Sequence, residues 1–167
     1  VPENNEKAVL WYRAAAGLGH VRAQCNLAHM YMRGAGVARD GEEALKWYGR
    51  AAEQGDAEAQ SRIGDIYANG DDIPMDVTKA IEWFVRAAEQ GYPYAQERIA
   101  WAYWYRVVPR NTDKAIEWWA RAGSNGSADA CNWLAWIYAT YDDPGIRDAG
   151  KAVDWAIKAD SNCPNDY

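Results

Sequence analysis

Residues 43–55 read Glu-Ala-Leu-Lys-Trp-Tyr-Gly-Arg-Ala-Ala-Glu-Gln-Gly, and this stretch decides the fold because it recurs along the chain. Residues 79–91 repeat its alanines, its tryptophan and its closing glycine. The tryptophan returns in steps of 36, 36, 35 and 37 residues, at Trp11, Trp47, Trp83, Trp118 and Trp155. A period of this length is typical of stacked helical pairs, in which each unit packs only on its neighbours. The sequence therefore predicts an all-α solenoid with a repeat of about 36 residues.

Columns of small and apolar residues predict two helices in each unit. Ala44, Trp47 and Ala51 are spaced i, i+3, i+7, and a second set in each unit is spaced i, i+4, i+8, so each set forms one helix face. The recurring Trp is expected to pack between helices. The predicted helices span about 4–17, 21–33, 40–53, 57–69, 76–89, 93–105, 111–123, 128–140 and 148–160. One helix of each pair should begin at a capping residue: Asn4, Asp40, Asp76, Asn111 and Asp148.

The repeat also predicts the domain organisation. Residues 1–167 are expected to form a single repeat domain of about nine helices. Its units are a half repeat at 1–19, followed by 20–55, 56–91, 92–126 and 127–163. The first residue is a valine inside a repeat, so we expect the chain to be a piece of a longer protein.

These columns resemble the Sel1-like repeat, a relative of the tetratricopeptide repeat. Residues 43–55 look like the second helix of that family and its closing turn. Ala59-Gln60, Ile63-Gly64, Tyr67 and Gly70 look like its first helix. The last unit departs from the pattern, since residues 134–140 lack the family's glycine and Cys163-Pro164 replaces the final turn. The resemblance implies a right-handed α-solenoid that serves as a protein–protein interaction scaffold, with no catalytic residues.

Composition and charge exclude several function classes. The net charge of −6 disfavours a surface that binds nucleic-acid phosphates or an anionic membrane. No apolar run is long enough to span a bilayer, so membrane insertion is not expected. Three cysteines do not form a disulfide framework, and they leave a cytoplasmic and a periplasmic or secreted location equally open.

Cys25 and His29 are the one pair with the spacing of a metal site, i and i+4. A metal site needs three or four ligands, and the other histidine, His20, lies in a predicted turn. No acid follows at the next turn to orient His29 as the base of a nucleophilic cysteine. The sequence therefore predicts no metal, no cofactor and no enzyme activity.

Five tryptophans fall outside the repeat column, and all lie in the last two full units: Trp101, Trp104, Trp119, Trp133 and Trp136. They either fill gaps between units or line a binding face. By analogy with tetratricopeptide solenoids, positions 2, 5, 9 and 12 of each first helix should face the inner, concave curve. The predicted partner-binding residues on or beside that face are Tyr94, Glu97, Arg98, Trp101, Trp104, Asp129, Asn132, Trp136, Glu58, Arg62, Asp65 and His29.

We interpret this face as the binding site of a monomeric, non-enzymatic scaffold for a peptide or protein partner. Tryptophan and tyrosine dominate binding hot spots because they bury a large area with few rotatable bonds. The carboxylates favour a basic partner. Two alternatives remain: a bacterial inhibitor or immunity protein that blocks a secreted toxin or enzyme, and a glycan-binding module whose tryptophans stack on sugars.

Overall fold

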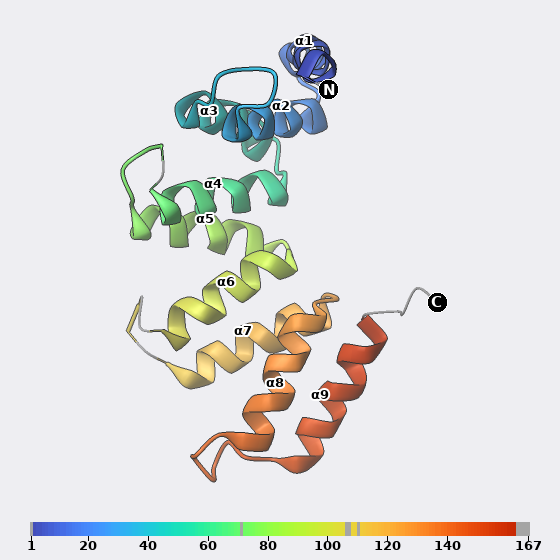
Figure 1. Ribbon diagram of the computed structural model, residues 1–167. Helices are drawn as coiled ribbons and strands as arrows, with labels where there is room; N and C mark the ends of the chain where they lie inside the picture. The colour runs from blue at the N-terminus through green and yellow to red at the C-terminus, as the bar shows by residue number, and fades with distance from the viewer. Residues whose placement is uncertain (1, 71, 106–107, 110, 163–167) are drawn as a thin grey trace. The chain divides into compact units, whose positions relative to one another are not determined.

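The computed structural model describes residues 2–70, 72–105, 108–109 and 111–162. These residues form nine α-helices and no strand (Figure 1). The helices are α1 (Pro2–Gly17), α2 (Val21–Arg33), α3 (Gly41–Glu53), α4 (Ala57–Asn69), α5 (Val77–Glu89), α6 (Pro93–Trp104), α7 (Thr112–Ser124), α8 (Ala128–Thr140) and α9 (Ala149–Asn162). The predicted all-α repeat is confirmed, and each predicted helix end lies within two residues of the observed one.

Side-chain caps explain why the helix starts were readable from the sequence. In Asp40, Asp76, Asn111 and Asp148, a side-chain oxygen accepts a hydrogen bond of 2.9–3.0 Å from the backbone N–H three residues later. These bonds satisfy amide groups that the first turn of a helix leaves without a partner. The predicted cap at Asn4 is wrong, because α1 begins at Pro2 and Asn4 lies inside its first turn.

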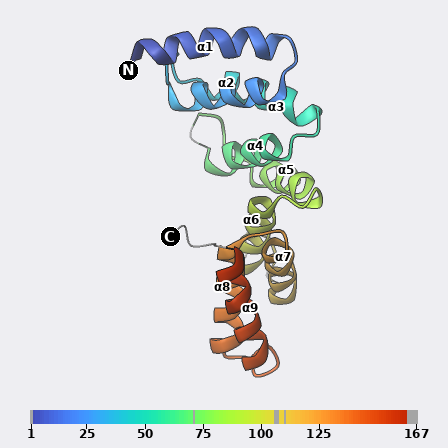
Figure 2. The same ribbon diagram turned by 90° about the vertical axis from the view of Figure 1, so that its right-hand side faces the viewer.

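The chain forms two compact units, residues 1–87 and 88–167. In the first unit, α2 and α3 pack side by side over a core of small and medium-sized side chains that includes Ala28, Ala51 and Ile63. In the second unit, α8 and α9 lie side by side (Figures 1 and 2). The core of this unit contains Trp119, Leu134 and Ile137, all fully buried.

Four of the five recurring tryptophans pack against the helical cores, but they are not the deepest aromatic residues of the repeat. The residue that follows each of them is buried instead in three units: Tyr48, Phe84 and Trp119. The tryptophans themselves are half-buried, except Trp11, which is 77% exposed. An arginine or lysine three residues later covers four of them, with its charged group 4.4–4.9 Å from the ring centroid: Trp47–Arg50, Trp83–Arg86, Trp118–Arg121 and Trp155–Lys158. A cation–π contact thus recurs on α3, α5, α7 and α9.

A column of buried glutamines ties consecutive helices together. The Nε2 groups of Gln24, Gln60 and Gln96 each donate to a backbone carbonyl eight residues earlier, at 3.0–3.3 Å. A buried amide without a partner is costly. These bonds therefore hold the end of α1 against α2, the end of α3 against α4 and the end of α5 against α6. In the last unit Asn162 donates instead to the carbonyl of Gly123, at 2.9 Å.

Candidate partner-binding surface

Four aromatic side chains form a continuous chain of ring contacts on α6, its C-cap and α8, and we call them the aromatic surface: Trp101, Tyr105, Trp133 and Trp136. Tyr105 stacks on Trp101 with ring centroids 5.2 Å apart. Trp133 stands nearly perpendicular to Trp101 at 4.8 Å and to Trp136 at 5.9 Å. Perpendicular and stacked pairs are the arrangements that aromatic rings prefer. The contact between Trp101 and Trp133 therefore joins two helices that belong to successive repeats.

The aromatic surface stays accessible although its rings touch one another. Tyr105 is 67% exposed, Trp136 51% and Trp133 39%, whereas Trp101 is half-buried between them. Trp101 and Tyr105 are four residues apart, and Trp133 and Trp136 are three apart, so each pair shares one side of its helix. The sequence spacing therefore places both pairs, and the packing of α6 near α8 brings them together.

A layer of packed aromatic rings, of which Trp119 is fully buried, supports this surface. Trp119 of α7 is fully buried and packs edge-on against Trp101 at 4.9 Å. Trp104 lies against Trp119 at 5.4 Å and against Tyr141 at 5.4 Å. Trp104, which was predicted to line the binding face, is half-buried and packs against the core of the second unit, as Trp101 does. The aromatic surface is thus held in place by side chains that are themselves packed.

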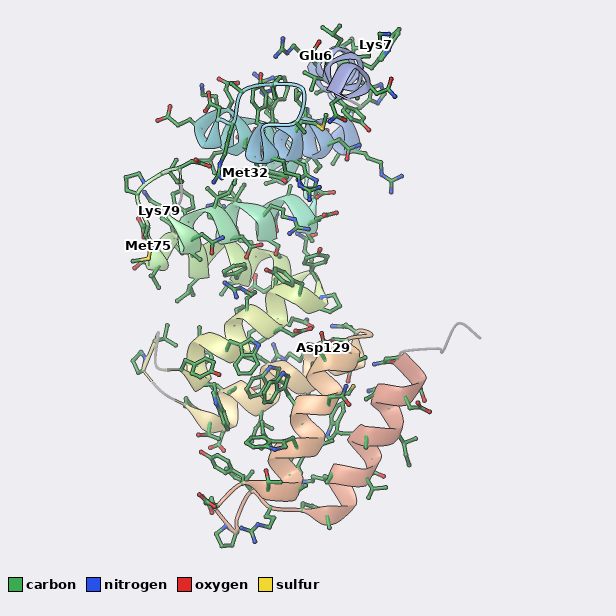
Figure 3. The ribbon with its side chains drawn as sticks, viewed as in Figure 1. Glu6, Lys7, Met32, Met75, Lys79 and Asp129 are labelled. Carbon is green, nitrogen blue, oxygen red and sulfur yellow. The ribbon has the colours of Figure 1, made fainter. Side chains whose placement is uncertain are left out.

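A polar, acidic end adjoins the aromatic surface. Ser127, the N-cap of α8, donates through Oγ to Glu97 Oε1 at 2.6 Å and accepts from the backbone N–H of Ala130 at 2.9 Å. Asp129 is exposed at the N-terminal end of α8 (Figure 3). Burial raises the pKa of Glu97, as does repulsion from Asp129, and the Ser127 bond opposes this rise only in part.

The remaining predicted residues of the second unit are placed on the same helices. Tyr94 is exposed two turns before Trp101 on α6 and makes an edge contact with Tyr92. Arg98 is half-buried on α6, and Asn132 is exposed on α8 beside Trp133 in the sequence. These side chains lie around the ring contacts without forming part of them.

We expect Glu97→Gln to stabilise the protein at pH 7. A raised carboxyl pKa means that the folded state holds the proton more tightly than the unfolded chain does, so wild-type stability falls as pH rises above the ordinary value of 4.5. Glutamine keeps an acceptor for Ser127 and carries no charge. Thermal unfolding from pH 3.5 to pH 7.5 should show a higher melting temperature for the variant at pH 7 and convergence below pH 4.5. A lower melting temperature at pH 7 would contradict the assignment, and Asp154→Asn, at an exposed site on α9, is the control.

The predicted residues of the first unit form a separate, charge-paired group. Arg62 lies 3.4 Å from Glu58 and 3.8 Å from Asp65, one turn of α4 away in each direction. His29 is exposed on α2, and its pKa is lowered by partial burial and by the nearby Arg33 and Arg62. The pair of Arg62 with Glu58 is exposed, whereas the side chain of Asp65 is only 18% exposed. An exposed pair contributes little energy.

Cys25 lacks the properties of a reactive cysteine. Its Sγ donates to Asp56 Oδ1 at 3.7 Å. Burial and the neighbouring carboxylates Asp56 and Glu58 raise its pKa to about 12. A thiol in this setting stays protonated at neutral pH, and the thiolate is the nucleophile and metal ligand. Among the described residues, no group of three or more His, Cys, Asp or Glu side chains is arranged to hold a metal ion.

Two members of the aromatic surface were missed by sequence reasoning. Trp133 lies at position 6 of its helix, outside the four positions assigned to the binding face, and Tyr105 follows the last turn of α6. Their spacing from Trp136 and Trp101, three and four residues, was a usable signal.

No helix in the described part of the chain is long and apolar enough to cross a membrane.

A family model described as the Sel1 repeat matches five segments that together span most of the chain: residues 1–20, 21–56, 57–92, 93–127 and 128–159. None of the curated proteins matches the sequence significantly.

Solved structures provide close relatives over nearly the whole chain. A Sel1 repeat protein from Oxalobacter formigenes is 34% identical with a TM-score of 0.84, over 95% of this chain and 64% of that one. The protective antigen c5321 of uropathogenic Escherichia coli is 33% identical with a TM-score of 0.80, over 95% of this chain and 34% of that one. The chain thus spans less than two thirds of the length of either relative. The immunity protein Pa5087 from Pseudomonas aeruginosa shares the fold at 20% identity and a TM-score of 0.54, over 93% of this chain and 75% of that one.

Proposed function

Because the chain belongs to the Sel1 repeat family, whose members generally bind proteins and are typically non-catalytic, we propose that its aromatic surface binds a peptide segment of a protein partner. The observation that carries this proposal is the exposure of Trp133 and Trp136 on a supported layer of packed rings. Contiguous exposed apolar side chains on a soluble protein mark interaction sites.

The rigidity of the aromatic surface favours binding over an accidental exposure of apolar area. Trp101 contacts Tyr105, Trp119 and Trp133 at once, so its ring has little freedom left to lose. A partner that covers rings already held in place avoids most of the ordering cost of association. Rigid tryptophans of this kind supply a large share of the energy at binding hot spots.

The acidic end gives the partner a preferred charge. Glu97 and Asp129 repel each other across the start of α8, and burial adds to the cost of the charge on Glu97. A cation brought by the partner would relieve that repulsion. The net charge of −6 on the chain acts in the same direction at longer range. The proposed partner therefore carries a lysine or arginine beside its apolar residues.

The test is selection from an unbiased random-peptide library displayed on phage, with the purified protein as bait. We expect the affinity of the best selected peptide, measured by fluorescence anisotropy, to fall about 30-fold in Trp136→Ala, because truncating a hot-spot aromatic costs about 2 kcal/mol or more. The melting temperature should stay close to that of the wild type, since half of this side chain is already in solvent.

Trp11→Ala is the matched control, because Trp11 is also an exposed tryptophan but lies on α1 in the other unit. This variant should retain full affinity for the selected peptide. Equal binding by wild type and Trp136→Ala, or the absence of any enriched peptide, would overturn the proposal.

A further inference from the structure

The exposed part of the aromatic surface is chemically uniform. Its accessible large apolar side chains, Tyr105, Trp133 and Trp136, are all aromatic, and none is aliphatic. Among the described residues of the same unit, the exposed large aliphatic side chains, Val153 and Ile157, lie on α9. The surface therefore offers ring faces and ring edges in alternation, because Trp133 stands at 86° to Trp101 and at 83° to Trp136.

Peptide recognition modes differ in what they require of the receptor. Addition of a strand needs an open sheet edge, and the described residues contain no strand. An amphipathic helix inserts apolar side chains spaced i, i+3, i+4 and i+7 into an apolar groove, whereas Trp133 and Trp136 stand as edges and faces of rings. A proline-rich segment instead packs its pyrrolidine rings against aromatic side chains, and its backbone is already extended before it binds.

The dimensions agree with this last mode. A polyproline II helix has three residues per turn and advances about 9 Å per turn, so it presents the same side every third residue. The two ring-to-ring steps from Trp101 through Trp133 to Trp136 measure 4.8 and 5.9 Å and together cover little more than one such turn at most. A single turn of such a segment would thus lie across the exposed rings of Trp133 and Trp136.

Resting on the proposed function, we infer that the peptide is a proline-rich segment in the polyproline II conformation, with a basic residue at one end. The prolines contact the exposed rings of Tyr105, Trp133 and Trp136, and the basic residue pairs with Glu97 and Asp129 at the start of α8. This charge sets the direction of the segment, since a polyproline II helix can approach an aromatic surface in either sense. The exposed indole side chains additionally offer N–H groups to the backbone carbonyls of the segment, which its conformation leaves solvated.

The experiment extends the library selection by reading the sequences of the enriched peptides and testing one synthetic series. We expect enrichment of prolines three residues apart, with arginine or lysine at one end. In the series, a fluorescein-labelled peptide of this pattern is compared with a counterpart that has alanine in place of each proline and with one that has alanine in place of the arginine. Replacing each proline with alanine should weaken binding at least about 10-fold, because it removes both the ring contacts and the preformed conformation.

The Asp129→Asn variant separates the contribution of the charge to binding from that of the aromatic contacts. This variant should bind the arginine peptide about 2- to 5-fold more weakly, as is usual for loss of an exposed charge pair, and should bind the arginine-to-alanine peptide as the wild type does. Asp154→Asn, on α9, is the control and should bind both peptides normally.

The possible failures are distinguishable. Enriched peptides without a proline preference that still depend on Trp136 would overturn this inference and leave the proposed function standing. Tighter binding of cellohexaose than of any selected peptide, abolished in Trp136→Ala, would assign the rings to sugar stacking and overturn both. A selection that enriches no peptide would also overturn both.

Discussion

Trp119→Ala is expected to destabilise the protein by about 3–5 kcal/mol, the largest effect of any single side-chain truncation in the second unit. Trp119 is fully buried and touches Trp101 and Trp104 within a core that also contains Leu134 and Ile137. Removing the indole leaves a cavity that helices on three sides cannot close without losing their own contacts. Urea unfolding followed by far-UV circular dichroism should show an earlier transition, and the exposed rings above should lose their support.

Trp119→Phe is the matched control for this prediction. It keeps a ring in the core, and the indole N–H of Trp119 has no acceptor among the described residues, so no hydrogen bond is lost. The loss of stability should therefore be well below that of the alanine variant. Similar losses in the two variants would show that the indole is not packed as the ring contacts indicate.

The second large effect is expected for Gly36→Ala in the loop between α2 and α3. Gly36 has φ of +74°, a left-handed conformation that costs a residue with a Cβ about 1–2 kcal/mol. An added Cβ would also collide with the backbone carbonyl group of Asn5 in α1. Since α1 must shift to relieve the collision, we expect a total loss of about 2–4 kcal/mol.

Gly19→Ala separates the two causes in the same unit. Gly19 has φ of +91° but no atom within 4 Å of the position that its Cβ would occupy, so only the conformational cost applies. Thermal unfolding should rank the proteins as wild type, Gly19→Ala and Gly36→Ala in falling stability. Equal losses in the two variants would mean that α1 does not pack on the loop at Gly36.

The helices were predictable because their determinants are local. The cap at Asp40 acts on an amide three residues away, and the apolar columns follow from helical spacing alone. The sequence was a poorer guide to which aromatic side chains are buried. Trp47 and Tyr48 are adjacent and both aromatic, and which of them faces the core depends on how α3 is rotated against α2 and α4. The structure buries Tyr48 and leaves Trp47 half-exposed under Arg50.

The candidate site also combines features that follow from local sequence with features that depend on packing between helices. The repeat register placed Trp101 and Trp136 on one side of their helices, and both belong to the aromatic surface. The ring contacts of Trp133 and Trp104 could not be predicted from the register, because they depend on side chains of different helices. Trp104 turns toward Trp119 and Tyr141, whereas Trp133 fills the space between Trp101 and Trp136.

The sequence by itself determined the repeat, the helix boundaries and the surplus of tryptophan in the last two full units, since these follow from spacing and capping within a few residues. Only the tertiary structure decided which tryptophans are structural and which are accessible. The reason is that an indole can be buried from one side and exposed on the other, and the side that is covered depends on the neighbouring helix. In this chain α7 covers one layer of rings and leaves Trp133 and Trp136 exposed to solvent.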